Sequence, residues 1–540
     1  MAAQDFIIIA QSDSVDYAKY SKLPLARLPL FKNLVYPRMV HYNGAFLSHV
    51  DLLSMLATGR SFSSSEPEQR SGLLNIWNFA GFTGIHLANY LYDYEINSVV
   101  INNFDAEWER LARACDENPS ALLGLSTTFY LGWSEIKRIV TRIRASFPDI
   151  EIALGGAFVY ESMRTEGAAA IAKAMHKYGV KYCLYGVNSE SDLRDLILWR
   201  KKQKEGDPKV ANMITAGDDT TSYAVSGEEW HPPHLGSSVA HYHELELPFL
   251  NNTIQLRASS GCCFSCAFCT YPQISKGFHP TAMDQLDQQL RSVKKIPSIK
   301  NLVFIDDTLN VPPKRFKTFL KTVARYDIDW FSFLRVQFVD EEIARLMRDS
   351  GCKAVYLGIE SANNDILGNM NKKATKEEYL RGVELLRKYD ISCMAAFIVG
   401  FPGETEESIQ DNLDFIRNSG IDFYTLKEFF LIKGTRIDQD RDLYNLTGMH
   451  SNWEHSTMDS TQASEYKASM MQDIGDDCVF IDPDTSLWYL AYLYDQGFPI
   501  DVIASIQKKI NRIVCSQMDG NIDDNHPEFG KIMSLLEPLK

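Results

Sequence analysis

Three cysteines in one short segment constrain this chain more than any other feature of its sequence. Cys262, Cys266 and Cys269 follow the spacing C-x3-C-x2-C and come soon after a buried strand pattern at 253–256. Clustered thiolates in a large chain favour an iron–sulfur site. Three of them can hold three irons of a [4Fe–4S] cluster, which leaves the fourth iron without a protein ligand. The amino and carboxylate groups of S-adenosylmethionine (SAM) can chelate an open iron of this kind.

Other interpretations of the same segment are open. A zinc site would need a fourth ligand, and His279 is the only nearby candidate. A disulfide framework is not expected in a chain of 540 residues with ten cysteines. Cys263 forms an equally regular C-x2-C-x2-C set with Cys266 and Cys269, so it could replace Cys262 as the first ligand. The six remaining cysteines are scattered, and we expect them to be small buried apolar side chains.

The composition indicates a globular chain of two or three domains, because 540 residues exceed one ordinary core. Hydrophobic residues at 45% and charged residues at 23% are typical of such proteins. The net charge of −15 argues against a large nucleic-acid footprint. No stretch approaches the roughly 20 apolar residues of a membrane span, and the N-terminus does not look like a signal peptide. We therefore expect a cytoplasmic protein with no nucleic-acid or membrane partner.

Residues 72–200 alternate strand and helix patterns, which predicts an α/β domain over 1–200 with a doubly wound, Rossmann-like parallel sheet. Strands are expected at the N-terminus and at 73–79, 98–102, 121–128, 151–157 and 182–186, with helices at 81–95 and 134–146. Ligands of such sheets bind beyond the carboxyl ends of the strands. The residues there are small, hydroxylated or without a side chain, which suits a bulky polar ligand: Ser126, Thr127, Thr128, Gly155, Gly156, Ala157 and Gly186.

Residues 201–250 are polar and rich in turn formers, which predicts a linker. A second alternating block at 251–440 predicts an open, partial (β/α)6 TIM-like barrel, whose chemistry lies at the carboxyl ends of its strands. The remainder, 441–540, is expected to be a mostly helical cap. The expected strands are 253–256, 301–306, 330–337, 354–360, 393–400 and 422–426, and the helices are 281–294, 313–326, 340–350, 375–389 and 405–419.

Side chains near the cysteines and at several barrel strand ends resemble the SAM-binding patterns of radical SAM enzymes, and that resemblance implies the following roles. Phe268 precedes the third cysteine and could pack beside the adenine. Arg335 and Gln337 are predicted to share one face of a strand, where Arg335 could pair with the SAM carboxylate.

Later strand ends add to this set. Glu360, with Ser361 beside it, could bond the ribose hydroxyls, and Gly400 could let the backbone approach the adenine. Each of these signals alone could be ordinary turn chemistry. Asp306 and Asp307 fit a structural role and a functional role equally well.

The cysteine spacing, the aromatic Phe268 and the order of the later motifs resemble the radical SAM superfamily. The Ser–Thr and Gly–Gly strand ends of the first block resemble the cobalamin-binding domain of class B radical SAM methyltransferases. In that comparison Ser126 and Thr127 face the nucleotide tail of cobalamin. The usual Asp-x-His-x-x-Gly loop is missing, so no protein histidine is expected below the cobalt. A nucleotide-binding Rossmann-like domain is the alternative.

The segment 444–459 is similar to natural-product members of this group, and the phosphinothricin-type P-methyltransferases look nearest. The resemblance implies an enzyme that uses a [4Fe–4S] cluster, SAM and cobalamin to methylate an unactivated carbon or phosphorus centre. Its substrate would be a small molecule or peptide in natural-product biosynthesis, and its electron donor a flavodoxin or ferredoxin. His450, Trp453 and His455 could line the substrate pocket.

Three rival functions follow from the same features. An enzyme of the same architecture could transfer the aminocarboxypropyl fragment of SAM or catalyse a rearrangement. A tRNA methylthiotransferase would need a second cysteine triad and a basic RNA-binding domain, and the sequence offers neither. A carrier of cobalamin or of an iron–sulfur cluster would leave the predicted SAM-binding motifs without a role.

Overall fold

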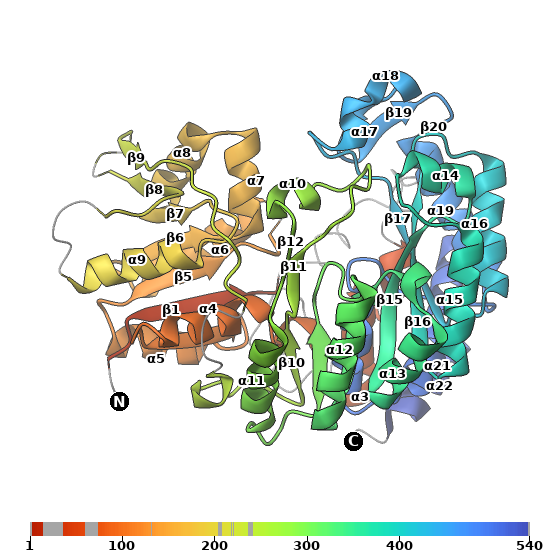
Figure 1. Ribbon diagram of the computed structural model, residues 1–540, viewed down its shortest axis with the longest axis horizontal. Coiled ribbons are helices and arrows are strands. Elements are labelled where there is room, and N and C mark those ends of the chain that lie inside the picture. Colours follow the sequence, from red (N-terminus) through yellow and green to blue (C-terminus); the bar gives the residue numbers. More distant parts are fainter. Residues whose placement is uncertain are drawn as a thin grey trace. The chain divides into compact units, whose positions relative to one another are not determined.

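The computed structural model describes residues 3–13, 36–59, 74–130, 132–202, 208–217, 219, 221–235 and 241–537. These residues form two compact units, and Figure 1 shows the elements of each. The first unit comprises the described parts of 1–15, 77–255 and 284–299, and the second comprises the rest. Within the described ranges, none of the helices is long and apolar enough to cross a membrane.

The first unit is built on a seven-stranded sheet with the order β4-β1-β5-β6-β7-β8-β9. The neighbours from β4 to β7 pair in parallel, and β8 and β9 continue the sheet antiparallel. The chain crosses from β1 to β4 on one side and returns to β5 on the other, so the strand order reverses between β1 and β5. The prediction of a doubly wound sheet is confirmed. The strands are β1 (Phe6–Gln11), β4 (Ser98–Asn103), β5 (Leu122–Ser126), β6 (Glu151–Gly155), β7 (Tyr182–Leu184), β8 (Met213–Ala216) and β9 (Tyr223–Val225).

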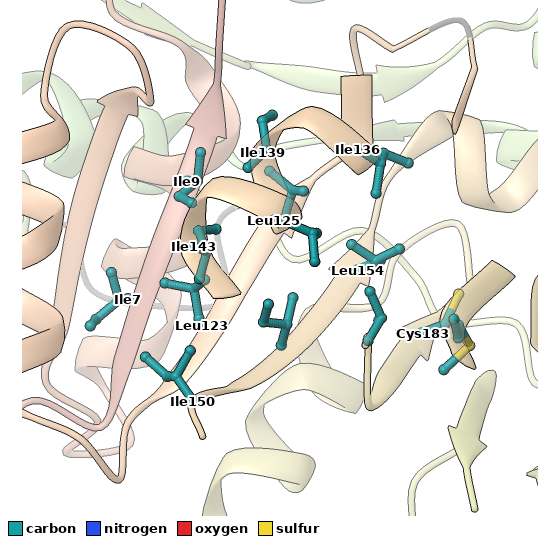
Figure 2. Packing of buried hydrophobic residues seen from close by; sticks show 14 of the residues in the cluster. Ile7, Ile9, Leu123, Leu125, Ile136, Ile139, Ile143, Ile150, Leu154 and Cys183 are labelled. Carbon is teal, nitrogen blue, oxygen red and sulfur yellow. The ribbon is translucent and has the colours of Figure 1, made fainter. Parts of the chain in front are cut away.

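Alternating apolar side chains give this sheet two buried faces. Ile7 and Ile9 of β1 belong to one core and Phe6 and Ile8 to the other. Figure 2 shows the first core, in which the isoleucines of α6 lie over β1, β5 and β6. That core packs against α5 (Trp108–Glu117), α6 (Trp133–Ser146), α7 (Ala157–Thr165) and α8 (Ala168–Tyr178), and the other against α4 (Phe82–Tyr92) and α9 (Glu190–Lys201).

The second unit contains a seven-stranded sheet with the order β10-β13-β14-β15-β16-β17-β21. The pairs from β13 to β21 are parallel, and β10 and β21 are the two edges, so the sheet is open. The predicted partial barrel is confirmed. Its strands are β10 (Thr253–Leu256), β13 (Asn301–Phe304), β14 (Asp329–Leu334), β15 (Cys352–Glu360), β16 (Ser392–Val399), β17 (Phe423–Glu428) and β21 (Val479–Phe480).

Helices follow these strands, and shorter elements surround the cysteine segment. The helices that follow the strands are α12 (Pro313–Val323), α13 (Glu341–Asp349), α14 (Asn364–Asn369), α15 (Lys376–Lys388) and α16 (Glu406–Asn418). The elements near the cysteines are β11 (Ser259–Gly261), α10 (Tyr271–Ser275), β12 (Phe278–Pro280) and α11 (Met283–Lys294).

The C-terminal region is mostly helical, as predicted, but it also supplies strands. β21 adds a seventh strand to the barrel sheet, and β18 to β20 form a small sheet of their own. Strands of two to four residues are too short for alternation to show in the sequence. The elements are α17 (Arg436–Gln439), α18 (Arg441–Tyr444), β18 (Thr447–Met449), β19 (Asn452–His455), β20 (Met458–Asp459), α19 (Ser460–Ile474), α20 (Ser486–Asp495), α21 (Ile500–Met518) and α22 (Pro527–Leu536).

Three N-terminal expectations need revision. The strand predicted at 73–79 is wrong, because η4 (Ile76–Asn78) is a short 3-10 turn; residue 73 lies outside the described residues. The predicted linker 201–250 contains β8 and β9 of the first sheet. Residues 36–59 were expected in the first domain, but they belong to the second unit and contact its helices α21 and α22. The backbone N–H of His41 donates to Gln517 Oε1 at 2.6 Å. The other domain bounds stay predictions.

Those residues 36–59 form a hairpin and a helix. A short amphipathic segment carries no signal for which core it joins, because its apolar face fits any apolar partner. The elements are η2 (Tyr36–Arg38), β2 (Met39–Tyr42), β3 (Ala45–Ser48) and α3 (His49–Thr58).

Ile139→Ala tests the core of the first unit. Ile139 is fully buried in α6, so its truncation should lower the free energy of unfolding of this unit by about 2–4 kcal/mol. Urea denaturation followed by circular dichroism measures the change. Val187→Ala is the matched control, because this side chain is exposed and should change the same quantity by less than about 0.5 kcal/mol. Equal losses in both variants would contradict the packing.

Candidate cofactor sites

Two carboxyl groups, the buried Asp306 and the half-buried Asp307, anchor the strand that leads to the cysteine segment. Asp306 accepts hydrogen bonds from the backbone N–H of Ala258 at 3.0 Å and from Ser259 Oγ at 2.5 Å. Asp307 accepts from the backbone N–H of Gly261 at 3.1 Å. Burial raises the pKa of Asp306 to about 6. These contacts support the structural interpretation of both aspartates.

The candidate thiols differ in exposure. Cys262, Cys266 and Cys269 are half-buried, whereas Cys263 is exposed. Cys262 Sγ lies 3.0 Å from Thr308 Oγ1. Burial, together with the neighbouring thiols of Cys266 and Cys262, raises the pKa of Cys269 to about 11. Among the residues that the structure describes, no three Cys, His, Asp or Glu side chains form a site for a single metal ion.

The loop after α14 holds the cysteine segment in place. The backbone N–H of Ala267 donates to Met370 O at 2.8 Å. Asn371 Nδ2 donates to the carbonyl of Ser265 at 2.7 Å and to its hydroxyl at 3.0 Å. The positions of the thiols therefore depend on residues about 100 positions later in the chain.

Arg335 lies against the same segment. Its guanidinium carbon is 3.7 Å from the centroid of the Phe264 ring, and Nη1 is 3.9 Å from Cys266 Sγ. Its Nε and Gln337 Oε1 are buried and have no hydrogen-bond partner among the described residues. Unpaired buried polar atoms are costly, so these two fit a site that receives a polar ligand.

The expectation that Arg335 and Gln337 share a strand face is wrong. β14 ends at Leu334, one residue before Arg335, and Gln337 lies in the 3-10 turn η7 (Val336–Phe338). Asn310 explains the change, because its side chain accepts from the N–H of Arg335 at 3.1 Å and donates to its carbonyl at 2.8 Å. The backbone N–H and carbonyl of Arg335 therefore bond to Asn310 instead of to a neighbouring strand.

Glu360 ends β15 with the left-handed φ of 68°. Its Oε1 lies 3.0 Å from Lys372 Nζ, and the Lys372 side chain is only 6% exposed. Lys372 Nζ is also 5.9 Å from the centroid of the half-buried Phe268 ring. A side chain at Gly358 would collide with Glu360 Oε1 at 2.8 Å. The structure therefore brings Glu360 and Phe268 together around Lys372. The sequence analysis missed this lysine because no sequence pattern distinguishes it from the adjacent Lys373.

Ser361 and Gly400 have structural partners. Ser361 is fully buried, and its Oγ donates to Asn412 Oδ1 at 3.4 Å. Gly400 has φ 89°, and a Cβ there would lie 2.5 Å from the ring of Trp453. His455 Nε2 is 3.2 Å from the Gly400 carbonyl. Position 400 therefore requires glycine because the ring of Trp453, and not a cofactor, lies too close to leave room for a side chain.

The three candidate pocket residues of the segment 444–459, His450, Trp453 and His455, separate into two groups. Trp453 and His455 are buried and stack on each other at 5.1 Å between ring centroids. His450 is exposed and stacks on Phe430, which is 51% exposed. Only His450 of the three is available to a substrate in this structure.

Glu404 was also missed by the sequence analysis. It is fully buried after β16, where its Oε2 accepts from the backbone N–H of Gly400 at 2.5 Å and its Oε1 from Asn412 Nδ2 at 3.2 Å. Burial raises its pKa to about 8. Its place in a Gly-rich turn suggested only loop chemistry, because burial cannot be read from the sequence.

In the first unit the predicted strand ends lie at neighbouring positions of the sheet. The backbone N–H and Oγ1 of Thr127 both donate to Gly155 O, at 2.7 and 3.0 Å. Gly156 has φ 115°, and a Cβ there would lie 3.0 Å from the amide nitrogens of Thr127 and Thr128. Ser126 Oγ is 3.1 Å from Thr128 Oγ1. These residues hold two strand ends close together and keep side chains away from their amides.

The remaining two predicted residues of this set differ. Ala157 is exposed at the start of α7. A Cβ at Gly186 would lie 2.7 Å from Ser189 Oγ and 2.9 Å from Asn212 Nδ2, so this glycine serves packing within the unit.

Comparison with known proteins decides the class of the barrel. Residues 256–416 match the family model of the Radical SAM superfamily. Residues 256–416 form a radical SAM domain. This match confirms the superfamily predicted from the cysteine spacing, and the domain contains the cysteine segment together with Arg335, Glu360 and Lys372.

Two curated relatives of the chain are methyltransferases. An uncharacterized methyltransferase of Pyrococcus horikoshii is 30% identical over 205 residues, which are 37% of this chain and 44% of the relative. The bacteriochlorophyllide d C-12(1)-methyltransferase of Chlorobaculum tepidum is 33% identical over 175 residues, which are 32% of this chain and 38% of that enzyme. The matches thus span less than half of each relative.

A solved structure shares the fold over a much longer stretch. The cobalamin-dependent S-adenosylmethionine radical enzyme OxsB, with aqua-cobalamin and SAM bound, matches 99% of this chain and 79% of its own with a TM-score of 0.54. The identity is 14%, so the match shows the fold alone. It confirms the combination of a Rossmann-like domain with a radical SAM domain.

The raised pKa of Glu404 predicts a pH-dependent stability. Its folded-state pKa of about 8 lies above the ordinary value of 4.5, so the folded chain binds the proton more tightly. This stabilisation is complete below about pH 4.5 and is lost as the pH rises through about 8. Glu404→Gln should remove the dependence, so the variant should gain about 1 kcal/mol on the wild type per pH unit in this window.

Urea denaturation at several pH values measures that difference. Glu406→Gln, which changes an exposed glutamate of the same turn, is the control and should run parallel to the wild type above pH 5. Parallel curves for Glu404→Gln would contradict the raised pKa.

Proposed function

We propose that the chain is a cobalamin-dependent radical SAM methyltransferase. The observation that carries the proposal is the position of the three thiols, which lie inside a radical SAM domain, with Cys266 beside Arg335. Rivals without SAM chemistry give no reason for a buried cation at a cysteine loop. The two methyltransferase relatives support methyl transfer as the reaction.

Cys262, Cys266 and Cys269 would hold the iron–sulfur cluster. Thiolates are the donors that such clusters need, and half-burial suits a site that admits a cofactor but limits water. When bound, the cluster supplies an electron and an open iron for the cleavage of SAM. Arg335 lies close enough to Cys266 to offset the charge of the thiolates. Its unpaired Nε would pair with the SAM carboxylate.

Glu360, Lys372 and Phe268 would hold the rest of SAM. Glu360 would accept from the ribose hydroxyls, with its second oxygen left free by the bond of Oε1 to Lys372. Phe268 would pack against the adenine, supported by Phe401 at 6.3 Å between ring centroids. Ser361 and Gly400 would support this site through their buried contacts and would not touch the cofactor.

The strand ends of the first unit would bind cobalamin. Gly155, Gly156 and the exposed Thr128 and Ala157 leave room for a bulky cofactor against the backbone, and the fold is that of a cobalamin-binding enzyme. Ser126 and Thr127 would face its nucleotide tail, and Gly186 would act through packing. When bound, cobalamin supplies the methyl group that is transferred.

The substrate is proposed from the chemistry of the class. We propose a small molecule or peptide of a natural-product pathway, methylated at an unactivated carbon or phosphorus centre. The relative from Chlorobaculum tepidum, whose name describes methylation at a carbon position of a pigment, supports a carbon acceptor. A flavodoxin or ferredoxin would donate the electron. A cytoplasmic location remains a prediction of the sequence.

Anaerobic reconstitution tests the function as a whole. The chain is loaded with iron, sulfide and hydroxocobalamin, reduced, and incubated with SAM, and bound cobalamin and 5′-deoxyadenosine are measured. Deoxyadenosine formation with cobalamin retained on the chain is the expected result. Candidate substrates then give a product mass increased by one methyl group. An increase by an aminocarboxypropyl group, or no increase, would replace methyl transfer with the rival reaction of the same architecture.

Substitution of single cysteines tests the ligand set. Cys262→Ala should reduce deoxyadenosine formation to background, because a cluster held by two thiolates is lost on isolation. Cys263→Ala is the matched control, since this thiol is exposed, and it should leave cleavage unchanged. Iron content and the visible absorption of the cluster report the same difference. Cleavage retained in Cys262→Ala and lost in Cys263→Ala would move the first ligand to position 263.

A further inference from the structure

An aromatic pair lies where the strand order of the first sheet reverses. Trp77 is held at the end of β1, because its carbonyl accepts from Gln11 Nε2 at 2.6 Å. Phe129 follows the end of β5, the neighbour of β1 in the sheet. Their ring centroids are 5.9 Å apart with an edge-on angle of 67°. Ligands of open α/β sheets bind at such a reversal point, beyond the carboxyl ends of the strands.

The pair is both rigid and accessible. Phe129 is 43% exposed, although it is a large apolar side chain, and Trp77 is half-buried. The turn that carries Trp77 is fixed on both sides, since Gln11 Nε2 also donates to Phe79 O at 2.8 Å and Asn102 Nδ2 donates to Asn78 O at 3.1 Å. An exposed Phe129 beside a half-buried Trp77, whose turn is fixed, provides a partly exposed apolar surface.

No histidine lies in the described segments next to the point where the strand order reverses. The segments that follow the strand ends or precede α4 are 74–81, 104–107, 127–130 and 156, and no histidine occurs in them. The two histidines of the long β1–α4 connection are in the second unit, where His41 contacts Asp524 and His49 contacts Gln507. The described segments at the reversal point thus offer an apolar surface and no histidine. The histidines nearer α9 are bound to carboxylates, His86 to Glu190 and His231 to Asp192.

We infer that Trp77 and Phe129 form the apolar floor beneath the corrin ring of cobalamin, where other cobalamin domains place a ligating histidine. This inference rests on the proposed cobalamin binding. A corrin is a flat macrocycle with an apolar face and a rim of amides. Aromatic rings bury such a face with little loss of side-chain freedom, and the neighbouring hydroxyls of Ser126 and Thr128 suit the polar rim.

Cobalamin affinity of the full-length chain tests the floor. Hydroxocobalamin binding is measured by equilibrium dialysis with absorbance detection, for the wild type and for Phe129→Ser and Trp77→Ser. Loss of one aromatic contact should weaken binding roughly tenfold. Phe129→Tyr keeps the ring and should keep the wild-type affinity.

Tyr223→Ser is the matched control. Tyr223 is 41% exposed and lies on the edge strand β9 of the same sheet, away from the reversal point. It should bind hydroxocobalamin as the wild type does. Iron content after reconstitution and the thermal melting point confirm that each variant is folded.

Cobinamide, which lacks the nucleotide base, tests the absence of a histidine ligand. Reduced to the Co(II) state on the wild-type chain, it should show no nitrogen splitting in its electron paramagnetic resonance spectrum. A three-line nitrogen splitting would overturn the inference.

The outcomes separate the inference from the proposed function. If the wild type binds hydroxocobalamin and Phe129→Ser binds it equally well, the floor is overturned while cobalamin dependence stands. If the wild type binds no hydroxocobalamin, the proposed cobalamin dependence fails and the inference fails with it. Weakened binding in both serine variants, with Tyr223→Ser unchanged, is the expected result.

Discussion

The placement of one buried cation, Arg335, organises the radical SAM domain. Asn310 binds both backbone groups of Arg335 and ends the strand there. The side chain then reaches Phe264 and Cys266 in the cysteine segment and donates to the carbonyl of Lys372. A buried guanidinium must be paired on most of its nitrogens to offset its desolvation. Three separate segments are therefore fixed by the requirement to solvate a single charge.

The same requirement recurs at the next strand end. Lys372 follows a loop that supports the cysteines, and its ammonium is almost fully buried against Glu360. A pair of this kind adds little to stability, because the desolvation of both charges offsets their attraction. Its position at the carboxyl end of a barrel strand is where functional groups of this fold gather. We interpret the pair as a rigid holder for a ligand with hydroxyl groups.

In the first unit the controlling constraint is topological. The reversal of strand order between β1 and β5 leaves the ends of those strands uncovered by a crossover helix. Small residues on β5 and β6 keep that edge open, and the aromatic pair supplies the apolar part of its surface. Polar, small and apolar groups at one sheet edge match a cofactor that is itself part polar and part apolar.

The sequence by itself determined the two alternating blocks, the open barrel and the superfamily. Strand and helix periodicity is local, and the cysteine spacing lies within eight residues. The sequence also placed Glu360 at the end of a barrel strand, where the structure has it. The roles of Glu360 and Phe268 toward a cofactor stay predictions.

Only the tertiary structure decided which of these groups are free. It turned Gly400 and Ser361 toward Trp453 and Asn412, moved Arg335 off its strand, and brought Lys372 beside Glu360. It also joined Trp77 to Phe129 across 52 positions of the chain, and attached residues 36–59 to the C-terminal helices. Contacts of this kind depend on which faces of distant elements pack together, and short-range patterns carry no information about that choice.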